Sequence, residues 1–356
     1  MANLGMRILS GATAALALVV GSERGFAIEP FDFGNTLQGA TVGFPIAVPP
    51  PPGVYGLLET LIAPNASGVG QFNGYSVSAF LWAPELVWST GYQFLGANLT
   101  MAVIQPFFDT AVYPTNDIGP PFEPTTIWTQ NISNTIFTPI LLQWRLAPEW
   151  FAAAGFTFIG PDGSRFNGTN TPDYWTFEPR AALAYITKDW HLSANFKYDF
   201  NTTSQGHTGA YQTLAAAVAG APIPNPLLAA TIASFGNGYT SGQDAFLDLT
   251  AAYQYGKWEF GPIATFKWQT TSDTPGSGFT CAQVAAITTA TGHPLPCGVA
   301  ENYSLGGVVG YDFGPARLQV WATDAVHAQD DFLGWAVYTR LTFKIWGPEP
   351  PPMYKK

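Results

Sequence analysis

The twelve residues from Trp190 to Asn201 alternate without a break between apolar and polar side chains. Successive side chains of a β-strand point to opposite faces, so one face of this segment would carry four aromatic rings and two aliphatic groups. The other face would carry the polar side chains His191, Ser193, Asn195, Lys197, Asp199 and Asn201. A strand of this length with these two faces is typical of a membrane β-barrel, whose outside meets lipid and whose inside meets water or polar groups.

The same alternation recurs in residues 175–185, 247–255, 258–269 and 333–345. We therefore predict an all-β protein, a transmembrane antiparallel β-barrel of about twelve strands, with ten or fourteen strands as alternatives. The strands are expected near residues 53–65, 71–88, 93–109, 127–146, 149–160, 175–188, 190–203, 244–256, 257–272, 301–313, 314–326 and 332–346.

The composition agrees with a membrane barrel. Charged residues make up 11% of the chain and aromatic residues 15%, whereas an ordinary soluble domain has about 25% charged residues. Beyond residue 20, no apolar run reaches the roughly 20 residues that a membrane-spanning helix needs. The competing interpretation is a secreted β-sandwich. The net charge of −10 argues against a nucleic-acid partner.

The N-terminus has the features of a signal peptide for export. Arg7 precedes an apolar stretch at 8–20, and small residues before and at Ala27 favour cleavage there, with cleavage after Gly21 as an alternative. Residues 1–27 are therefore expected to be removed from a bacterial protein that reaches the outer membrane. Bacterial barrels have short periplasmic turns and longer outer loops, which predicts that the long connections, 204–243 among them, lie outside.

Two regions interrupt the β pattern. Residues 28–52 are glycine-rich and end in four prolines, and we expect this N-terminal segment either in the periplasm or as a plug in the lumen. Within the outer-loop insert 204–243, two Ala- and Leu-rich stretches at 211–220 and 226–235 predict short helices. The barrel is expected over 53–346, followed by a periplasmic tail at 347–356.

The inward-facing charged residues are candidates for the lining of the lumen. The alternation places both signs there, which favours ion pairs between strands rather than a selectivity filter of one sign. The candidates are Arg145, Glu178, Arg180, His191, Lys197, Asp199, Asp248, Glu259, Lys267, Arg317, Arg340 and Lys344.

The two cysteines, Cys281 and Cys297, both fall in the connection 273–300. In an exported protein such a pair predicts a disulfide that holds a loop, with two free thiols as the alternative.

The sequence does not indicate an enzyme. His191 and Ser193 would lie about 7 Å apart along one strand, which is long for a base and a nucleophile. No G-x-S-x-G motif and no cluster of zinc ligands occurs. We therefore expect no catalytic residue, no metal site and no cofactor.

Several sequence blocks resemble a known family. Residues 50–55 read P-P-P-G-V-Y, residues 173–179 read D-Y-W-T-F-E-P, and residues 198–201 read Y-D-F-N before Y-T-S-G-Q at 239–243. Together these blocks are similar to those of the transporters of the meta-pathway of phenol degradation, over roughly residues 50–346. The insert between Asn201 and Tyr239 is longer than that family's pattern. The resemblance implies an outer-membrane barrel associated with the breakdown of aromatic compounds.

Two functions fit these features. The first is a channel in the outer membrane for the passive uptake of small apolar, in particular aromatic, compounds, with membrane lipids and the solute as its partners. The second is a sealed barrel with a structural or surface-binding role and no transport. The width of the lumen distinguishes the two.

Overall fold

The computed structural model describes residues 34–70, 73–114, 127–166, 171–204, 226–235, 237–283 and 299–348. They include one antiparallel sheet and the helix α3 (Pro226–Phe235). The strands are β1 (Gly53–Gly68), β2 (Tyr75–Phe94), β3 (Ala97–Ile104), β4 (Phe107–Pro114), β5 (Ile127–Ile132), β6 (Ile136–Arg145), β7 (Trp150–Ile159), β8 (Ser164–Phe166), β9 (Thr176–Ile186), β10 (Trp190–Asn201), β11 (Asp244–Tyr255), β12 (Trp258–Gln269), β13 (Glu301–Asp312), β14 (Ala316–Gln329), β15 (Phe332–Leu333) and β16 (Trp335–Trp346).

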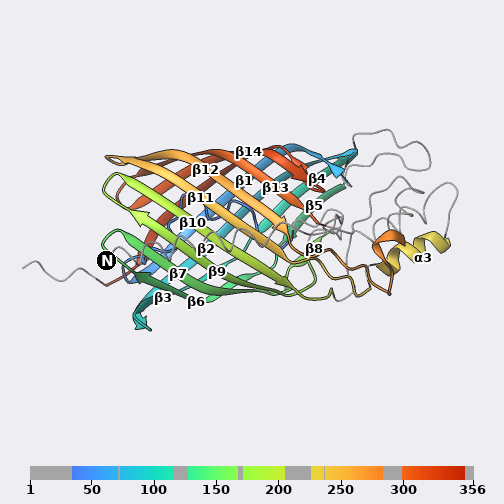
Figure 1. Ribbon diagram of the computed structural model, residues 1–356, viewed down its shortest axis with the longest axis horizontal. Coiled ribbons are helices and arrows are strands. Elements are labelled where there is room, and N and C mark those ends of the chain that lie inside the picture. The colour runs from blue at the N-terminus through green and yellow to red at the C-terminus, as the bar shows by residue number, and fades with distance from the viewer. Residues whose placement is uncertain are drawn as a thin grey trace, which may run out of the picture.

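The sheet closes into the predicted barrel of twelve strands (Figure 1). Four strands of the wall are interrupted, so that β3 continues as β4, β5 as β6, β7 as β8 and β15 as β16. β1 pairs with β2 on one side and with β16 on the other, which joins the two ends of the sheet. A closed barrel leaves no unpaired edge, and in lipid every backbone polar group needs such a partner.

The two faces of each strand differ as the sequence predicts. On β10, the outward Leu192 and Phe196 are each 38% exposed, whereas the inward Asn195 and Lys197 are 2% and 4% exposed. The rest of the wall repeats this arrangement, with exposed aromatic side chains such as Trp88, Trp258 and Trp335 on the outside. Apolar side chains on the surface and polar ones inside are the reverse of a soluble domain and suit a wall in contact with lipid.

One turn differs from the sequence prediction. We expected a strand over 71–88 and a connection before residue 93, but β2 continues to Phe94 and the turn lies at Leu95 and Gly96. These two residues have φ angles of 51° and 75°. Two successive positive φ angles are what a tight two-residue hairpin turn needs, and glycine adopts them without strain.

The short turns gather at one end of the barrel, and α3 projects from the other end (Figure 1). α3 confirms the second of the two helices predicted in the insert, while the first, at 211–220, lies outside the described residues. Among the residues that the structure describes, no helix is long and apolar enough to cross a membrane.

A charge on the outward face should destabilise the barrel in proportion to its depth. We expect Phe196→Arg, in the middle of β10, to lower the free energy of unfolding by about 2–4 kcal/mol, and Leu146→Arg, beside a turn, by less than about 1 kcal/mol. Denaturant unfolding of the protein folded into lipid vesicles measures both. Equal losses at the two positions would mean that the wall does not face lipid.

Candidate functional site

Residues 34–50 lie inside the barrel, where inward-facing polar side chains bind them. Asn35 Nδ2 donates to Thr176 Oγ1 at 2.8 Å, and Thr36 Oγ1 donates to Glu178 Oε2 at 2.9 Å. Gln38 Nε2 donates to Thr265 Oγ1 at 3.0 Å. The strands that provide these partners are far away in sequence, so closure of the barrel is needed to bring them to the segment.

Asp248 on β11 binds the middle of the segment through three hydrogen bonds. Its Oδ1 accepts from the Gly39 backbone N–H at 3.1 Å, and its Oδ2 accepts from the Thr41 backbone N–H at 3.1 Å and hydroxyl at 2.5 Å. Asp248 is 0% exposed. These bonds satisfy a carboxyl group that would otherwise be costly to bury.

The carbonyl groups of the segment also have partners on the wall. Arg340 donates to the carbonyl oxygens of Val42, at 2.9 Å, and of Ala40. Gln319 Nε2 donates to the Gly43 carbonyl at 2.6 Å. Gly43 has a φ of 69°, and a Cβ there would lie 2.9 Å from the same Gln319 nitrogen, so only glycine fits this close approach.

Apolar contacts complement these hydrogen bonds. Val42 is completely buried in a cluster with Leu61, Leu81, Val308 and Trp321. These residues come from β1, β2, β13 and β14, so the segment packs against this arc of the wall. Further along the segment, Ala47 packs against Ala153 and Ala184 of the wall.

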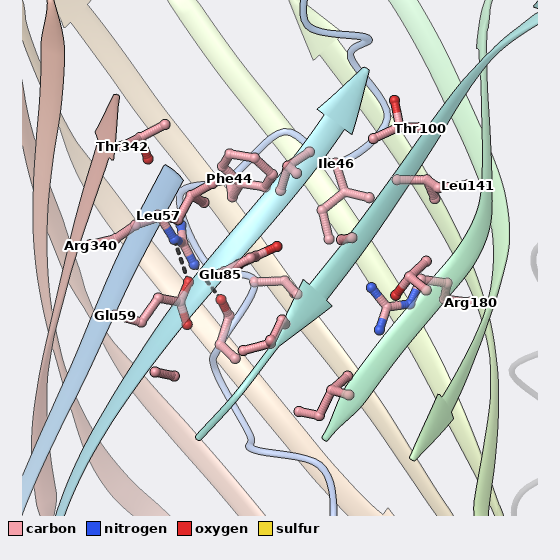
Figure 2. A pocket seen from close by; sticks show the side chains of 18 of the residues that line it. Phe44, Ile46, Leu57, Glu59, Glu85, Thr100, Leu141, Arg180, Arg340 and Thr342 are labelled. Carbon is pink, nitrogen blue, oxygen red and sulfur yellow. Dashed lines mark hydrogen bonds and ion pairs between the residues drawn. The ribbon is translucent and has the colours of Figure 1, made fainter. Parts of the chain in front are cut away.

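The part of the lumen beside β1, β2, β3 and β6 is mostly aliphatic and contains a cavity of about 380 Å³ (Figure 2). Apolar side chains of β1, β2, β3, β6 and β7 border it on one side, and the segment borders it on the other through Phe44 and Ile46. Charged side chains of β9, β10, β14 and β16 also reach it. The apolar side chains from the barrel wall are Leu57, Leu81, Ala83, Val87, Ala102, Ile104, Ile136, Leu141 and Ile159. Val87 and Leu81 are six residues apart on one strand, so the cavity runs for about 20 Å along the wall. The segment and the wall thus enclose an apolar space.

The structure distributes the predicted lining residues over three environments. Glu178, Arg180, Lys197, Arg317 and Arg340 line the cavity. A second group is buried inside the barrel away from the cavity: His191, Asp199, Asp248, Glu259 and Lys267. The remaining two are exposed at strand ends: Arg145, which donates to the Pro148 carbonyl in a turn, and Lys344.

Ion pairs form among the inward charges. Arg340 Nε donates to Glu59 Oε1 at 2.5 Å on the neighbouring strand, and Arg180 pairs with Glu178. Glu259 accepts hydrogen bonds from Arg317 and Gln319. Arg340 is also flanked by the rings of Trp321 and Phe44, at 4.8 and 5.1 Å from the ring centres. These contacts fix the charged groups in place and suit a rigid lumen.

The sequence analysis missed the aliphatic side of the lumen. On β1 and β2 the inward residues Leu57 and Leu81 alternate with outward residues that are equally apolar, such as Leu58 and Trp82. The polarity alternation therefore disappears there. Counting outward and inward positions from the neighbouring turns would have identified these residues as inward.

The end of the barrel that carries α3 contains a buried acidic residue, Asp273, beyond the end of β12. Its Oδ1 accepts from the Gly242 backbone N–H at 2.7 Å and from Gln269 Nε2 at 2.6 Å. Burial raises the pKa of the Asp273 carboxyl to about 7. Cys281, eight residues further on, is disulfide-bonded. Cys297 lies outside the described residues, so the Cys281–Cys297 pairing stays a prediction.

Within the described ranges, no group of three His, Cys, Asp or Glu side chains is arranged to hold a metal ion. His191 Nδ1 lies 3.4 Å from Glu259 Oε2, deep inside the barrel. These observations do not test for catalysis, and the expectation that the protein is not an enzyme stays a prediction.

The sequence model of a family described as "MetA-pathway of phenol degradation" matches residues 62–341. This match covers most of the 356 residues. The chain belongs to this family. No curated protein matches the chain in sequence.

Three solved structures of outer-membrane proteins are similar to this chain to different degrees. The COG4313 outer membrane channel from Pseudomonas putida F1 matches with a TM-score of 0.59 and 11% identity, over 85% of this chain and 98% of that chain. The translocator domain of autotransporter NalP from Neisseria meningitidis matches with a TM-score of 0.44 and 10% identity, over 82% and 88%. The toluene transporter TodX from Pseudomonas putida matches with 0.38 and 10%, over 91% and 98%. The similarity to the COG4313 channel supports the outer-membrane type of barrel, which the exposed apolar side chains of the wall also indicate.

Removal of the Asp248 carboxyl group should loosen the segment. In Asp248→Ala, the N–H groups of Gly39 and Thr41 lose their acceptor, so we expect amide hydrogens of residues 39–43 to exchange with deuterium at least tenfold faster. Asp312→Ala, which removes a hydrogen bond in an exposed turn, is the control. Equal protection in the two variants would show that Asp248 does not hold the segment.

The α3 end of the barrel should become less stable as the pH rises. The Asp273 carboxyl has a pKa of about 7 in the folded protein, against about 3.9 in an unfolded chain. The folded state therefore keeps the proton between pH 4 and 7 while the unfolded state loses it, and the stabilisation present at low pH is lost through this range. Hydrogen exchange of residues 239–243, corrected for intrinsic rates, should be faster at pH 8 than at pH 5. Asp273→Asn should remove the difference, and a difference that persists would contradict this assignment.

Proposed function

We propose that this protein is a channel of the outer membrane for the passive uptake of small apolar compounds, aromatic ones included. The observation that carries the proposal is the aliphatic cavity beside residues 34–50. A water-filled porin presents a polar lumen, whereas this space is bordered by Leu57, Leu81, Ile104 and Leu141. Small-molecule sites are mostly apolar spaces of about 300–1,000 Å³, and the cavity falls in this range.

The proposed mechanism needs no energy source. An apolar solute would leave the outer surface, enter the aliphatic side of the lumen and pass along β1–β3 while the segment occupies the polar side. Membership of a phenol-degradation family and similarity to an outer membrane channel agree with this role. We place the short turns in the periplasm and the α3 end outside, as loop lengths favour.

A sealed structural barrel is the second candidate. It is favoured by Val42, which is completely buried against side chains of β1, β2, β13 and β14. In a sealed barrel the segment would be a permanent part of the core. Transport measurements on variants of the segment and of the cavity distinguish the two candidates.

Filling the cavity should reduce uptake. Ala102 lines the cavity on β3, and Ala102→Trp would occupy much of its volume. We expect uptake of radiolabelled toluene by intact cells to fall several-fold relative to cells with the unmodified protein. Ala154→Trp makes the same change on the outward face of β7 and serves as the control, since residue 154 is exposed. Uptake that is the same in both variants would favour the sealed barrel.

Removal of the segment should enlarge the pore. Without residues 34–48, the polar side of the lumen would fill with water, and the ionic conductance in a planar bilayer should rise severalfold. The strands do not include these residues, so the barrel should still fold, as its heat-dependent mobility on a gel would report. A folded barrel with unchanged conductance would contradict the idea that the segment narrows the lumen.

A further inference from the structure

Glu85 is an acidic residue on the mostly aliphatic side of the lumen, and its side chain lines the cavity (Figure 2). It lies opposite Leu57 on β1 and opposite Ile104 on β3. Glu59 is opposite Ala83, which makes it the diagonal neighbour of Glu85 on the same face. An acidic side chain thus interrupts the apolar wall of the cavity on β2.

The cationic side chains that line the cavity already have partners. Arg340 is bound to Glu59, Arg180 to Glu178, and Arg317 to Glu259. Lys197 Nζ donates to the Leu37 carbonyl at 3.2 Å. Each of these cations is thus bound to a group other than Glu85.

Within the part of the chain that the structure describes, no group donates a hydrogen bond to the Glu85 carboxyl. The nearby charged groups are Glu59, Arg340 and Arg180. A polar group that borders an apolar space is costly to leave without a partner, and a solute that supplies a donor relieves this cost.

We propose that Glu85 is a specificity-determining residue, which accepts a hydrogen bond from a hydroxyl or amino group of an otherwise apolar solute in the cavity. This inference rests on the proposed function and names the chemical class of its solute. A carboxyl oxygen accepts a hydrogen bond in either protonation state, so the role does not depend on the charge of Glu85. The aliphatic side chains around it would contact the hydrocarbon part of the solute.

Two consequences follow for selectivity. A solute with a donor should bind better than an isosteric one with a methyl group, because a site built for a donor is left unsatisfied by the methyl analogue. A carboxylate solute should bind poorly, since it has no donor to offer to Glu85 and the arginines that line the cavity are already paired with carboxylates of the protein. The cavity would therefore favour neutral or basic donors over both hydrocarbons and acids.

Phenol and toluene test the first consequence, because they have the same number of heavy atoms and differ in a hydroxyl against a methyl group. We expect the full-length protein in lipid nanodiscs to bind phenol about tenfold more tightly than toluene by isothermal titration, after subtraction of empty nanodiscs. A tenfold ratio corresponds to ~1.4 kcal/mol. Aniline should behave like phenol, and benzoate should bind more weakly than toluene.

Substitutions at Glu85 assign the preference to this residue. Glu85→Leu should abolish the tenfold ratio while toluene still binds, and Glu85→Gln should keep most of it, because the amide carbonyl is also an acceptor. Leu86→Val, at the adjacent outward position, is the matched control and should keep the full ratio. Heat-dependent mobility on a gel verifies that each variant folds.

A phenol preference that survives in Glu85→Leu would overturn the inference. Equal binding of phenol and toluene to the unmodified protein would also overturn it, but would leave the proposed function intact. If neither solute binds to the unmodified protein, the proposed function fails as well.

Discussion

The chemistry of the lumen depends on how the backbone of residues 34–50 is satisfied inside a closed wall. A chain segment without regular structure carries peptide groups that need partners when it is removed from water. In this barrel the partners are inward side chains, above all Asp248 for N–H groups and Arg340 and Gln319 for carbonyl groups. The mixed charges of the lumen therefore hold the segment, in addition to pairing with one another.

This arrangement divides the lumen into two parts with different chemistry. The side chains that hold the segment by hydrogen bonds come mainly from β9 to β14 and from β16, whereas the aliphatic side chains that border the cavity come from β1 to β7. The division explains why a lumen with many charged residues can still suit an apolar solute. Charged side chains that are held by ion pairs and by the segment do not compete for the space beside Leu57 and Leu81. What remains accessible is mostly apolar, and among the described residues Glu85 is the acidic side chain there that is not held by an ion pair such as the one between Glu59 and Arg340.

The wall could be predicted from the sequence because its cause is local. Side chains alternate along a strand, and β10 meets lipid on one face and polar groups on the other, so its pattern could be read directly. The turn at Leu95 and Gly96 could not be placed in the same way, since Phe94 and Ala97 directly on either side of it are apolar. The signal that was available there was the glycine.

The contents of the lumen were harder to predict because they depend on distant partners. Residues 34–50 mix glycines with polar and apolar residues and show no strand pattern, and their hydrogen-bond partners are more than 90 positions away in most cases, as for Thr41 and Asp248. Glu85 was overlooked because it stands alone in an apolar stretch, between Pro84 and Leu86. A lone acidic residue at an inward position of such a stretch is a signal that could have identified it.

The central claim is that an apolar solute occupies the space between residues 34–50 and the aliphatic wall. Crystals of the protein soaked with bromobenzene would test this directly through the anomalous scattering of bromine. We expect a bromine peak inside the barrel, within contact distance of Phe44 or Ile46 on one side and of Leu57, Leu81 or Ile104 on the other. Bromine peaks confined to the outer, lipid-facing surface, with none in the lumen, would contradict the account.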